Sequence, residues 1–405
     1  MVKVKFLTLK DMSLEGKKVL VRVDYNVPIK NGMVADDTRL KATIPTINFL
    51  LENHCKIILM SHLGRPKDLF KKGKSLEEAK KELTLKPVAE DLSEILGMGV
   101  YFAENSITLD SVNTNIPDED IVLLENVQFH EGETKNNDDF AKKLASFGDI
   151  YVNDGFGQSH REYASFCAIT KFIPSCAGFL VEKEVKELSK LLNPERPFVA
   201  IVAGAKADKI GALRVLVKKA DRILIGGVLA NTFLKAKGLD IGASKFDEET
   251  FAVAKEIIGL AGKKLVFPVD AVIADKFDKD AQAKVVKTAS MPKEWMSLDI
   301  GPETIERYKA ELKNAKTVLW AGPLGVFEME KFSNGTKTIA EFIAGLSAVT
   351  IIGGGDTAAA IQSFDLADKV THVSTGGGAS LEFIEKEGNL PALVALENYC
   401  NKSKE

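Results

Sequence analysis

The amino-acid sequence predicts an α/β fold with two doubly wound parallel sheets, and two observations support this class. Short runs rich in β-branched and other apolar residues recur along the whole chain, and most of them end at Gly, Asp or Asn. The runs are nearly continuous and do not alternate with polar residues, which is typical of strands buried on both faces. Amphipathic segments lie between the runs, and this alternation of strand and helix predicts right-handed crossovers between parallel strands.

The expected strands follow one another in two groups. In the first half of the chain they cover residues 19–26, 56–64, 121–126 and 149–157. In the second half they cover residues 198–205, 222–227, 264–270, 317–323, 349–356 and 369–378. Each group is large enough to form a Rossmann-like sheet that is covered by helices on both faces.

Two of the intervening segments show the helical period clearly. Residues 86–96 place Val88 and Leu92 on one face, and residues 138–147 do the same with Phe140 and the apolar residues that follow it. Spacings of three and four residues between apolar side chains indicate a helix that packs on a core. We therefore expect helices at both places.

The length of the chain predicts a division into two domains. A single hydrophobic core stops growing beyond about 250–300 residues, and this chain has 405. The clearest boundary is the charged helix expected at residues 181–193, which has apolar residues on one side and ends in a Pro-containing turn. We expect a first domain over residues 1–180, this helix between the domains, and a second domain from residue 194 onward.

Composition and charge argue against several functional classes. Hydrophobic residues make up 45% of the chain and charged residues 27%, as in globular proteins and unlike disordered ones. The formal net charge of −3 argues against nucleic-acid binding through bulk charge. No apolar run approaches the roughly 20 residues of a membrane-spanning helix, and we expect no signal peptide. The four cysteines lack Cys-x-x-Cys spacing, as expected of thiols in a reducing cytoplasm.

Polar side chains gather where the expected strands of the first half end. Arg supplies only 8 of the 54 cationic side chains, and its planar group binds phosphate and carboxylate in a way that Lys does not. The polar residues at or near these strand ends are Arg22, Asp24, Asn26, Arg39, Ser61, His62, Arg65, Asn153, Asp154, His160 and Arg161. Ligands of open α/β sheets bind beyond the carboxyl ends of the strands. A helix cap or a surface charge explains any one of them, but together they favour a pocket for a small, highly anionic ligand.

In the second half of the chain, the expected strands are followed by glycines where those of the first half are followed by arginines. Residues 349–361 read as a strand, a Gly-rich turn and a helix with Asp356 in its first turn, and residues 372–383 repeat the pattern. Unobstructed amide groups at a helix N-terminus bind anions, and a neighbouring carboxylate can hold Mg²⁺ that phosphate oxygens share. The alternative is that glycine serves only the tight packing of strand against helix.

Three other motifs suggest different functions. The dinucleotide-binding pattern Gly-x-Gly-x-x-Ala fits Gly353, Gly355 and Ala358, but the next strand lacks the acidic residue that would hold a ribose. The Gly-Lys-Ser of residues 73–75 resembles the end of a P-loop without a strand before it, and residues 153–157 are too short for a calcium loop. A nicotinamide-dependent dehydrogenase therefore stays open as the weaker alternative.

Eight segments in order resemble the phosphoglycerate kinase family over nearly the whole chain: VRVDYNVP, SHLGRP, LLENVQFHEGE, VNDGFGQSHREYAS, AGAKADKI, GPLGVFE, IIGGGDTA and HVSTGGGASLE. The family has two α/β domains across a cleft, and its members transfer a phosphoryl group reversibly between 1,3-bisphosphoglycerate and Mg-ADP, giving 3-phosphoglycerate and ATP. The resemblance implies that the first domain binds the glycerate and that residues 194–388 bind the nucleotide. It also implies that the tail, residues 389–405, returns to the first domain.

The resemblance assigns substrate-binding roles in the first domain. It implies that Asp24 and Asn26 hold the hydroxyl and carboxyl end of the substrate. It also implies that His62, Arg65 and Arg161 form a basic patch for the phosphate of the substrate.

The catalytic positions that the resemblance implies are Arg39, Lys206, Gly355 and Gly378. Arg39, which also binds the substrate, is expected to face the phosphoryl group in transit, and Lys206 to hold that group from the nucleotide side. The helix that faces this group is expected to be capped at residues 376–378.

The nucleotide-binding residues that the resemblance implies are Lys206, Lys209, Glu328, Gly354, Gly355, Asp356 and Thr357. Glu328 is expected to hold the ribose and Asp356 the metal. Lys209 is expected near the inner phosphates, and the remaining residues are expected to meet the phosphates.

The chain also departs from the family pattern. Gln128 stands where the family usually has an arginine of the basic patch, and Ala321 replaces the usual asparagine of the Trp-Asn-Gly-Pro turn. Val228 replaces a glycine, and the spacing from Lys206 to Lys209 is one residue shorter than usual. These departures affect the fine geometry of binding and leave the reaction class unchanged.

No candidate nucleophile stands out, so we expect direct in-line transfer without a phospho-enzyme, because positioning and charge stabilisation dominate phosphoryl transfer. The expected cofactor is Mg²⁺ with ADP or ATP as substrate. The expected partners are small molecules only, with no nucleic acid and no membrane, and the protein is expected to be a cytoplasmic monomer. A non-catalytic sensor that binds both ligands is the second alternative, motivated by Gln128 and Ala321.

Overall fold

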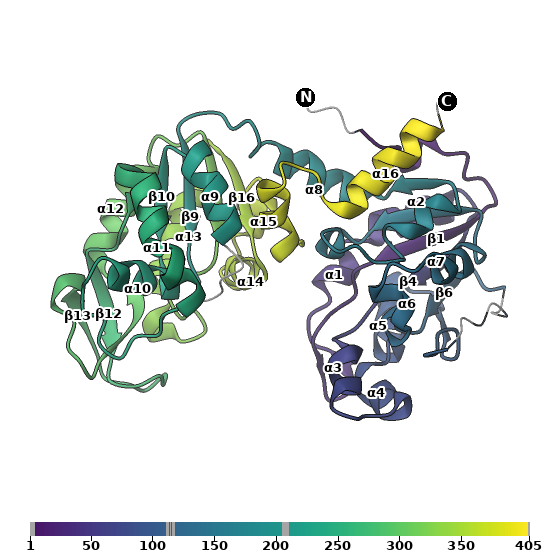
Figure 1. Ribbon diagram of the computed structural model, residues 1–405, viewed down its shortest axis with the longest axis horizontal. Coiled ribbons are helices and arrows are strands. Elements are labelled where there is room, and N and C mark those ends of the chain that lie inside the picture. The colour runs from purple at the N-terminus through teal and green to yellow at the C-terminus, as the bar shows by residue number, and fades with distance from the viewer. Residues whose placement is uncertain (1–4, 111–112, 114, 116–117, 205–209, 404–405) are drawn as a thin grey trace. The chain divides into compact units, whose positions relative to one another are not determined.

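The computed structural model describes residues 5–110, 113, 115, 118–204 and 210–403, and these form two compact units (Figure 1). The first unit comprises Met1–Lys186 together with Asn389–Glu405, and the second comprises Glu187–Gly388. In Figure 1 the first unit carries the purple and blue elements and the yellow helix α16 (Pro391–Lys402), and the second carries the green ones. None of the described helices combines the length and the apolar character needed to cross a membrane.

The first unit is built on a six-stranded sheet in the order β5-β6-β4-β1-β7-β8. Its strands are β1 (Lys18–Val23), β4 (Lys56–Met60), β5 (Tyr101–Ala103), β6 (Ile121–Leu124), β7 (Ile150–Asp154) and β8 (Ser175–Ala177). Every neighbouring pair is parallel. The central strand β1 pairs with both β4 and β7, so Val21 stands opposite Leu59 on one side and Val152 on the other. The predicted parallel sheet is confirmed here.

Helices cover this sheet, and the short hairpin β2 (Ile29–Lys30) and β3 (Met33–Val34) lies outside it. The helices are α1 (Thr38–Lys41), α2 (Ile44–Glu52), α3 (Pro66–Lys71), α4 (Leu76–Leu83), α5 (Lys86–Leu96), α6 (Glu131–Thr134), α7 (Asp138–Ala145) and α16. Apolar residues of α2 and α5, such as Leu50 and Leu92, form one buried cluster with Val21 and Leu59 of the sheet. Helix α5 has the predicted bounds and ends at Gly97, whose φ of +66° favours glycine.

The second unit contains another six-stranded parallel sheet, in the order β11-β10-β9-β15-β16-β17. Its strands are β9 (Phe198–Val202), β10 (Arg222–Ile225), β11 (Leu265–Val266), β15 (Thr317–Ala321), β16 (Val349–Gly353) and β17 (His372–Val373). Its helices are α9 (Ile210–Lys219), α10 (Gly227–Ala236), α11 (Glu248–Ala261), α12 (Pro302–Leu312), α13 (Asn334–Ala344), α14 (Gly355–Ser363) and α15 (Gly378–Glu385). Ile201, Trp320 and Ile352 of adjacent strands share one buried cluster with Tyr308 of α12.

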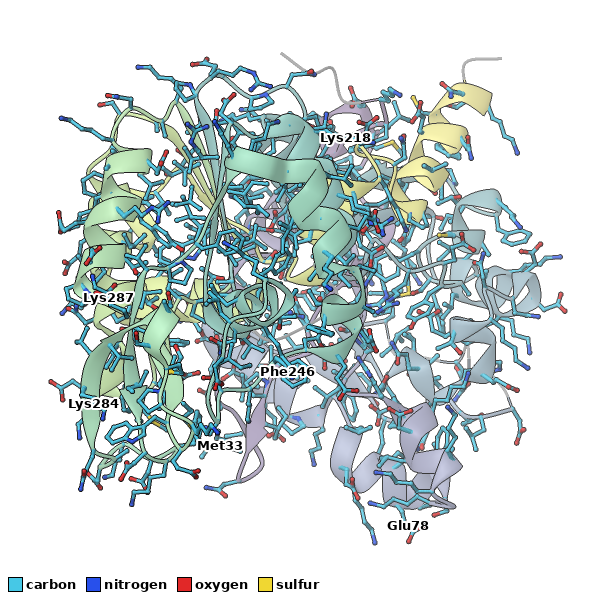
Figure 2. The ribbon with its side chains drawn as sticks, turned by 60° about the vertical axis from the view of Figure 1, so that its left-hand side comes forward. Met33, Glu78, Lys218, Phe246, Lys284 and Lys287 are labelled. Carbon is cyan, nitrogen blue, oxygen red and sulfur yellow. The ribbon has the colours of Figure 1, made fainter. Side chains whose placement is uncertain are left out.

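The second unit also contains an antiparallel sheet that the sequence analysis did not predict. It has the order β13-β12-β14 and consists of β12 (Asp270–Ala274), β13 (Ala283–Lys287) and β14 (Met296–Ile300). Strand β13 is largely exposed and carries Lys284 and Lys287, which are labelled in Figure 2. A short, lysine-containing edge strand lacks the continuous apolar run by which buried parallel strands are detected. This three-stranded sheet is therefore an addition to the two parallel sheets that were predicted.

Helix α8 (Phe179–Ser189) follows β8 and is held at its N-terminus by a buried carboxyl group. The Asp154 Oδ1 atom accepts hydrogen bonds from the backbone N–H groups of Leu180 (2.9 Å) and Val181 (3.4 Å). A side chain at Gly178 would clash with this carboxyl group, so the close approach requires glycine. Burial, which outweighs these hydrogen bonds, raises the pKa of Asp154 to about 7.

This raised pKa predicts how stability depends on pH. The folded chain holds the Asp154 proton more tightly than the unfolded chain, so the contribution of Asp154 to stability is lost as pH rises from about 4 to about 7. Asp154→Asn keeps an acceptor for α8 and cannot ionise. Its free energy of unfolding should fall less steeply over this range, by on the order of 3 kcal/mol in total.

Denaturant unfolding at several pH values measures this effect. Asp247→Asn is a matched control, because Asp247 caps α11 through the Thr250 N–H (2.7 Å) but is only half-buried. The free energy of unfolding of the control should fall with pH as steeply as that of the unmodified protein. The prediction would be contradicted if the free energy of unfolding of Asp154→Asn fell with pH as steeply as that of the unmodified protein.

Candidate active site

The strand order brings the predicted polar residues of the first unit to one edge of its sheet. Strand β1 lies between β4 and β7, and in this register Arg22 stands opposite Met60 while Val23 stands opposite Asp154. The residues that follow these strands therefore emerge side by side. They include Asp24 after β1 and His62 after β4, as ligand binding at the carboxyl ends of parallel strands requires.

Asp24 and Arg39 form an ion pair at this edge. The Arg39 Nη1 atom lies 2.7 Å from Asp24 Oδ2. Asp24 is 6% exposed, and Arg39 on α1 keeps about a third of its side chain exposed. Burial acts to raise the pKa of Asp24, but Arg39 and the weaker contributions of the other groups around Asp24 together outweigh burial, so the pKa of this carboxyl lies below its usual value. Asp24 is consequently ionised at neutral pH and holds the guanidinium of Arg39 in place.

His62 is buried beside this pair and is not a cation. It is 2% exposed, and its Nδ1 atom lies 3.9 Å from Asp24 Oδ1 without a hydrogen-bond partner among the described residues. Burial, against the raising effect of the Asp24 carboxylate, lowers the pKa of the imidazole to about 3. In this structure His62 therefore adds no positive charge, and its predicted part in binding the substrate phosphate stays a prediction. The neutral ring offers hydrogen bonds, and positive charge must come from the arginines.

Asn26 and Arg65 lie on two loops that are joined by a hydrogen bond. The Gly64 N–H donates to Asn26 Oδ1 (2.8 Å), which fixes the segment after β1 against the segment after β4. Arg65 directly precedes α3 and is exposed. Arg161 is also exposed and lies in the segment after β7. Neither guanidinium forms an ion pair with any of the described side chains, so both are available to an anion.

Arg22 does not belong to this exposed group. Its side chain is completely buried, and its Nε atom donates to Ser165 Oγ (2.7 Å). Residues alternate between the two faces of a strand, and Val21 and Val23 take the face with the cluster that contains Leu59. Arg22 therefore packs on the other face, beneath the ring of Phe166. Its expected place in an anion pocket at the strand end was wrong.

Asn126 is a positioning residue of this edge that the sequence analysis did not single out. It is buried at the end of β6, and its Nδ2 atom donates to the carbonyls of Leu63 (2.8 Å) and Leu83 (3.0 Å). Its Oδ1 atom accepts from the N–H of the half-buried Gln128 (3.1 Å). The only signal in the sequence was a polar residue at the end of an apolar run.

The second unit contains a cavity of about 500 Å³ at the corresponding edge of its own sheet. Two predicted site residues, Glu328 and Asp356, line it together. Both are exposed. Its walls are largely apolar and include Val228, Ala230, Leu234, Ile241, Met291, Met296, Leu298, Pro323, Leu324 and Val326. A largely apolar cavity with a few polar groups at its rim is typical of a site for a small organic ligand.

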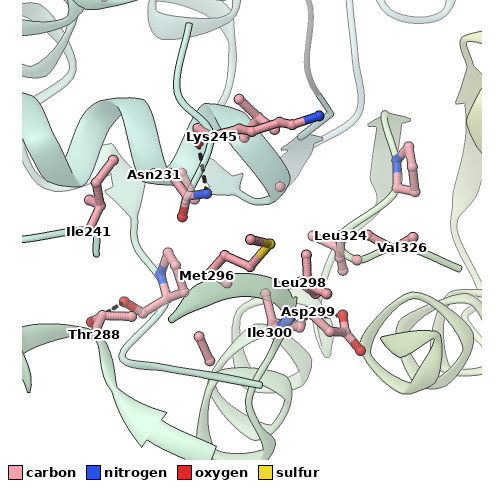
Figure 3. A pocket seen from close by; sticks show the side chains of 18 of the residues that line it. Asn231, Ile241, Lys245, Thr288, Met296, Leu298, Asp299, Ile300, Leu324 and Val326 are labelled. Atoms are coloured by element: carbon pink, nitrogen blue, oxygen red, sulfur yellow. Dashed lines mark hydrogen bonds between the residues drawn. The ribbon is translucent and has the colours of Figure 1, made fainter. Parts of the chain in front are cut away.

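Strand β14 supplies one wall of the cavity, as Figure 3 shows for Met296 and Leu298. The opposite side comes from α10, where Asn231 Nδ2 donates to the carbonyl of Lys245 (3.1 Å). Leu298 also accepts a backbone hydrogen bond from Val326 (2.9 Å), which joins β14 to the loop after β15. Because β14 was not predicted, this wall was not predicted either.

Buried Asp299 also lines the cavity, and it binds the start of α13. Its carboxylate accepts hydrogen bonds from the N–H groups of Gly335 (2.7 Å) and Ile300 (2.9 Å). Burial outweighs these bonds and raises the pKa of Asp299 to about 7. The segment over residues 334–344 is thereby held against β14.

Two glycine-rich turns follow the adjacent parallel strands β16 and β17. The φ angles of Gly354 (+91°) and Gly377 (+53°) lie in the left-handed region, which favours glycine. A Cβ atom at Gly355 or Gly378 would meet no atom within 4 Å. Packing of strand against helix therefore does not explain the glycines at the first positions of α14 and α15. Their open amide groups suit an anion instead.

Thr357 joins the first of these turns to the loop after β15. It is buried, and its Oγ1 atom accepts a hydrogen bond from the Gly322 N–H (2.6 Å). The Gly322 carbonyl in turn accepts from the indole N–H of Trp320 (2.7 Å). The hydroxyl of Thr357 can still donate its own proton. Lys206 and Lys209, by contrast, lie outside the described residues.

Comparison with known proteins establishes the family. The sequence pattern that defines phosphoglycerate kinase matches residues 9–387. A phosphoglycerate kinase of Moorella thermoacetica is 48% identical over 397 residues, covering 96% of this chain and 98% of the relative. One of Thermosipho africanus is 48% identical over 404 residues, covering 97% of this chain and 98% of the relative. The chain belongs to the phosphoglycerate kinase family.

Solved structures agree with this assignment. The phosphoglycerate kinase of Coxiella burnetii has a TM-score of 0.81 and is 39% identical, and the one of Pyrococcus horikoshii has a TM-score of 0.84 and is 31% identical. Both comparisons cover 98% of this chain and 100% of the solved chain. As a phosphoglycerate kinase, the chain transfers a phosphoryl group reversibly between 1,3-bisphosphoglycerate and ADP, giving 3-phosphoglycerate and ATP in glycolysis. The dehydrogenase alternative is thereby excluded.

The burial of His62 yields a prediction about its charge. The imidazole should stay neutral from pH 8 down to at least pH 5, since its pKa lies near 3. The ¹H–¹³C NMR signals of the ring should not titrate in this range, and His62→Gln identifies them by their absence. A signal of His62 that titrates with a midpoint near 6.5 would contradict the neutral assignment.

Proposed function

We propose that the two units divide the substrates of the kinase between them. The first unit binds 3-phosphoglycerate or 1,3-bisphosphoglycerate, and the second unit binds ADP or ATP with Mg²⁺. The observation that carries this proposal is the different chemistry of the two sheet edges. One edge has the Asp24–Arg39 ion pair, and the segments near it carry the exposed Arg65 and Arg161, which form no ion pair with the described side chains. The other edge has a largely apolar cavity, and α14 and α15 begin there with glycines that have open space around them.

The residues of the first unit suit a small phosphorylated carboxylate. The exposed guanidinium groups of Arg65 and Arg161 are proposed to bind its phosphate, because the planar fork of Arg matches phosphate oxygens. Asp24 and Asn26 are proposed to bind its hydroxyl and carboxyl end. Neutral His62 contributes a hydrogen bond and no charge. Gln128 leaves this edge with one cation fewer than is usual in the family.

The residues of the second unit suit a nucleotide. A planar base gains stability in the apolar cavity, because burial of its faces removes apolar surface from water. Glu328 lies at the rim and is proposed to accept hydrogen bonds from the ribose hydroxyls. The amide groups of Gly354 and Gly355 at the start of α14 are proposed to bind phosphate oxygens, together with Thr357. Lys206 and Lys209 are proposed to add the positive charge that these glycines lack.

Asp356 is the proposed contact of this chain with Mg²⁺. It lies exposed in the first turn of α14 and lines the cavity beside the open amide groups. Among the residues that the structure describes, no cluster of three or more His, Cys, Asp or Glu side chains could hold a metal alone. A single carboxylate fits Mg²⁺, which is commonly bound by one or two carboxylates and by substrate phosphates. When bound, Mg²⁺ neutralises part of the phosphate charge.

We further propose direct in-line transfer of the phosphoryl group between the two substrates. The cysteines do not support a covalent intermediate, since three of the four are buried and burial raises the pKa of the thiol of the half-buried Cys167 to about 12. Arg39 and Lys206 are proposed to stabilise the charge of the group in transit, and the amides of Gly355 and Gly378 to orient it. In-line transfer requires the two bound substrates to approach each other during turnover.

We also propose that the enzyme is a cytoplasmic monomer. The glycolytic role and the four free cysteines support the cytoplasm. The exposed apolar side chains come from separate elements, such as Met33 of β3, Leu260 of α11 and Val285 of β13. Scattered apolar residues of this kind are ordinary on the surface of a monomer.

Arg39→Ala tests the catalytic assignment. Loss of one preorganised charge donor should lower kcat by about 10²–10³-fold, because the guanidinium acts on charge that develops in the transition state. The KM values for both substrates should change far less. Steady-state kinetics in the direction of ATP consumption measures these constants, with Arg222→Ala as a surface control. A normal kcat for Arg39→Ala would remove Arg39 from the catalytic role.

Val326→Ala tests the nucleotide cavity. The variant removes apolar surface from the wall that faces the base, so the KM for MgATP should rise about 3–10-fold. The KM for 3-phosphoglycerate should stay unchanged, since the first unit is not altered. Val285→Ala on the exposed strand β13 is the matched control and should change neither constant. An unchanged KM for MgATP in Val326→Ala would exclude this cavity as the base site.

A further inference from the structure

Arg22 is a completely buried cation in the middle of the first unit. It lies on the central strand β1, and its guanidinium group is 4.5 Å from the centre of the Phe166 ring. Burial, against the effect of Glu133, lowers the pKa of this guanidinium. A buried charge is costly unless it is paired and hydrogen-bonded. The contacts of Arg22 therefore show what it stabilises.

The guanidinium bonds to three different segments of the chain. Its Nε atom donates to Ser165 Oγ (2.7 Å). Its Nη1 atom donates to the carbonyl of Val23 at the end of β1 and to that of Met60 at the end of β4 (3.4 Å). Because the guanidinium is planar and rigid, it fixes the spacing between these groups.

Glu133 completes the arrangement from a fourth segment. The buried carboxylate on α6 lies 3.8 Å from Arg22 Nη2 and accepts hydrogen bonds from the N–H (2.9 Å) and the hydroxyl (2.6 Å) of Ser165. The backbone carbonyl of Glu133 accepts from Ala164 (2.9 Å), and the Tyr151 hydroxyl donates to the Ser165 carbonyl (2.7 Å). The Nη2 atom itself has no hydrogen-bond partner among the described residues, so the shared hydroxyl of Ser165 is what joins the two charged groups by hydrogen bonds.

Each contact lies close in sequence to a residue of the proposed phosphoglycerate site. Val23 directly precedes Asp24, and Met60 lies two residues before His62. The other two contacts are similarly placed, since Ser165 lies near Arg161 in the segment after β7 and Glu133 lies near Gln128 in the segment after β6. One buried ion pair thus connects the segments after four strands of the sheet.

Stability alone is a weak reason for such a pair. Replacing a buried ion pair with uncharged residues of similar volume is often neutral or stabilising, because the cost of desolvation offsets the attraction. The network is better explained by the geometry that it imposes on the loops above it. The groups of a substrate site must stay within about 0.5 Å of the positions that bind the substrate productively.

We propose that Arg22 and Glu133 are positioning residues for the phosphoglycerate substrate. They touch no substrate and act by fixing the four loop segments so that Asp24, His62 and Arg161 match one small ligand. This inference rests on the proposed function, because it assumes that the phosphoglycerate binds at this edge.

The test replaces both charges together, as Arg22→Met with Glu133→Gln. Met fills the volume of the Arg side chain, and Gln keeps an acceptor for Ser165, so neither partner leaves a lone buried charge. The KM for 3-phosphoglycerate should rise about 10-fold, because misplaced groups bind more weakly. The KM for MgATP and the melting temperature should change little. Unchanged KM values, or a lower melting temperature with both KM values unchanged, would overturn the proposal.

Two further variants keep the test decisive. Ser165→Ala removes the hydroxyl that Arg22 and Glu133 share without removing a charge, and it should raise the KM for 3-phosphoglycerate about 3-fold. If the double variant fails to fold, an unchanged KM in Ser165→Ala overturns the proposal. Arg222→Met with Glu311→Gln is the matched control, because this pair (3.0 Å) is partly exposed and lies in the second unit. This control should leave the KM for 3-phosphoglycerate and the KM for MgATP unchanged.

Arg65→Ala separates this inference from the proposed function. Arg65 lies outside the network, and its loss should raise the KM for 3-phosphoglycerate if the substrate binds at this edge. If Arg65→Ala raises this KM and the double variant does not, only the positioning role is overturned. If neither variant changes it, the proposed location of the substrate is also wrong.

Discussion

Parallel pairing of strands is the constraint on which both proposed half-sites depend. In a parallel sheet each strand ends at the same edge, so residues far apart in sequence emerge together. The central positions of β1 in the first sheet and of β9 and β15 in the second decide which loops become neighbours. The pairs β1–β4 and β1–β7 place Asp24 beside the segment that carries His62. Helices α2 and α5 then bury one face of this sheet, and the loops at the edge remain for binding.

The carboxyl edges of the two sheets carry different chemical groups. At the first edge, positive charge is concentrated on a few arginines, and burial keeps His62 neutral beside the ionised Asp24. At the second edge, the proposed anion-binding groups are the backbone amides at the starts of α14 and α15, and the cavity walls supply apolar surface. Phosphoryl transfer needs position and charge stabilisation more than covalent chemistry. The division of these groups between two units fits that requirement.

The sequence predicted the two parallel sheets well, because buried strands such as 198–202 and 317–321 are continuous apolar runs with clear ends. It did not predict the small sheet of β12, β13 and β14. The edge strand β13 is largely exposed, carries Lys284 and Lys287, and lacks such a run. Arg22 was placed wrongly because its position near a strand end says nothing of the face on which its side chain lies. The apolar cavity was missed because its walls come from segments far apart in sequence. The roles of the site residues remain predictions.

Hydrogen–deuterium exchange of the full chain tests the division of substrates most directly. The account predicts that 3-phosphoglycerate alone slows exchange in residues 24–39, 61–65 and 158–166. It predicts that Mg-ADP alone slows exchange in residues 226–234, 322–329 and 353–358. Protection of the second set by 3-phosphoglycerate, with none in the first set, would contradict the central claim.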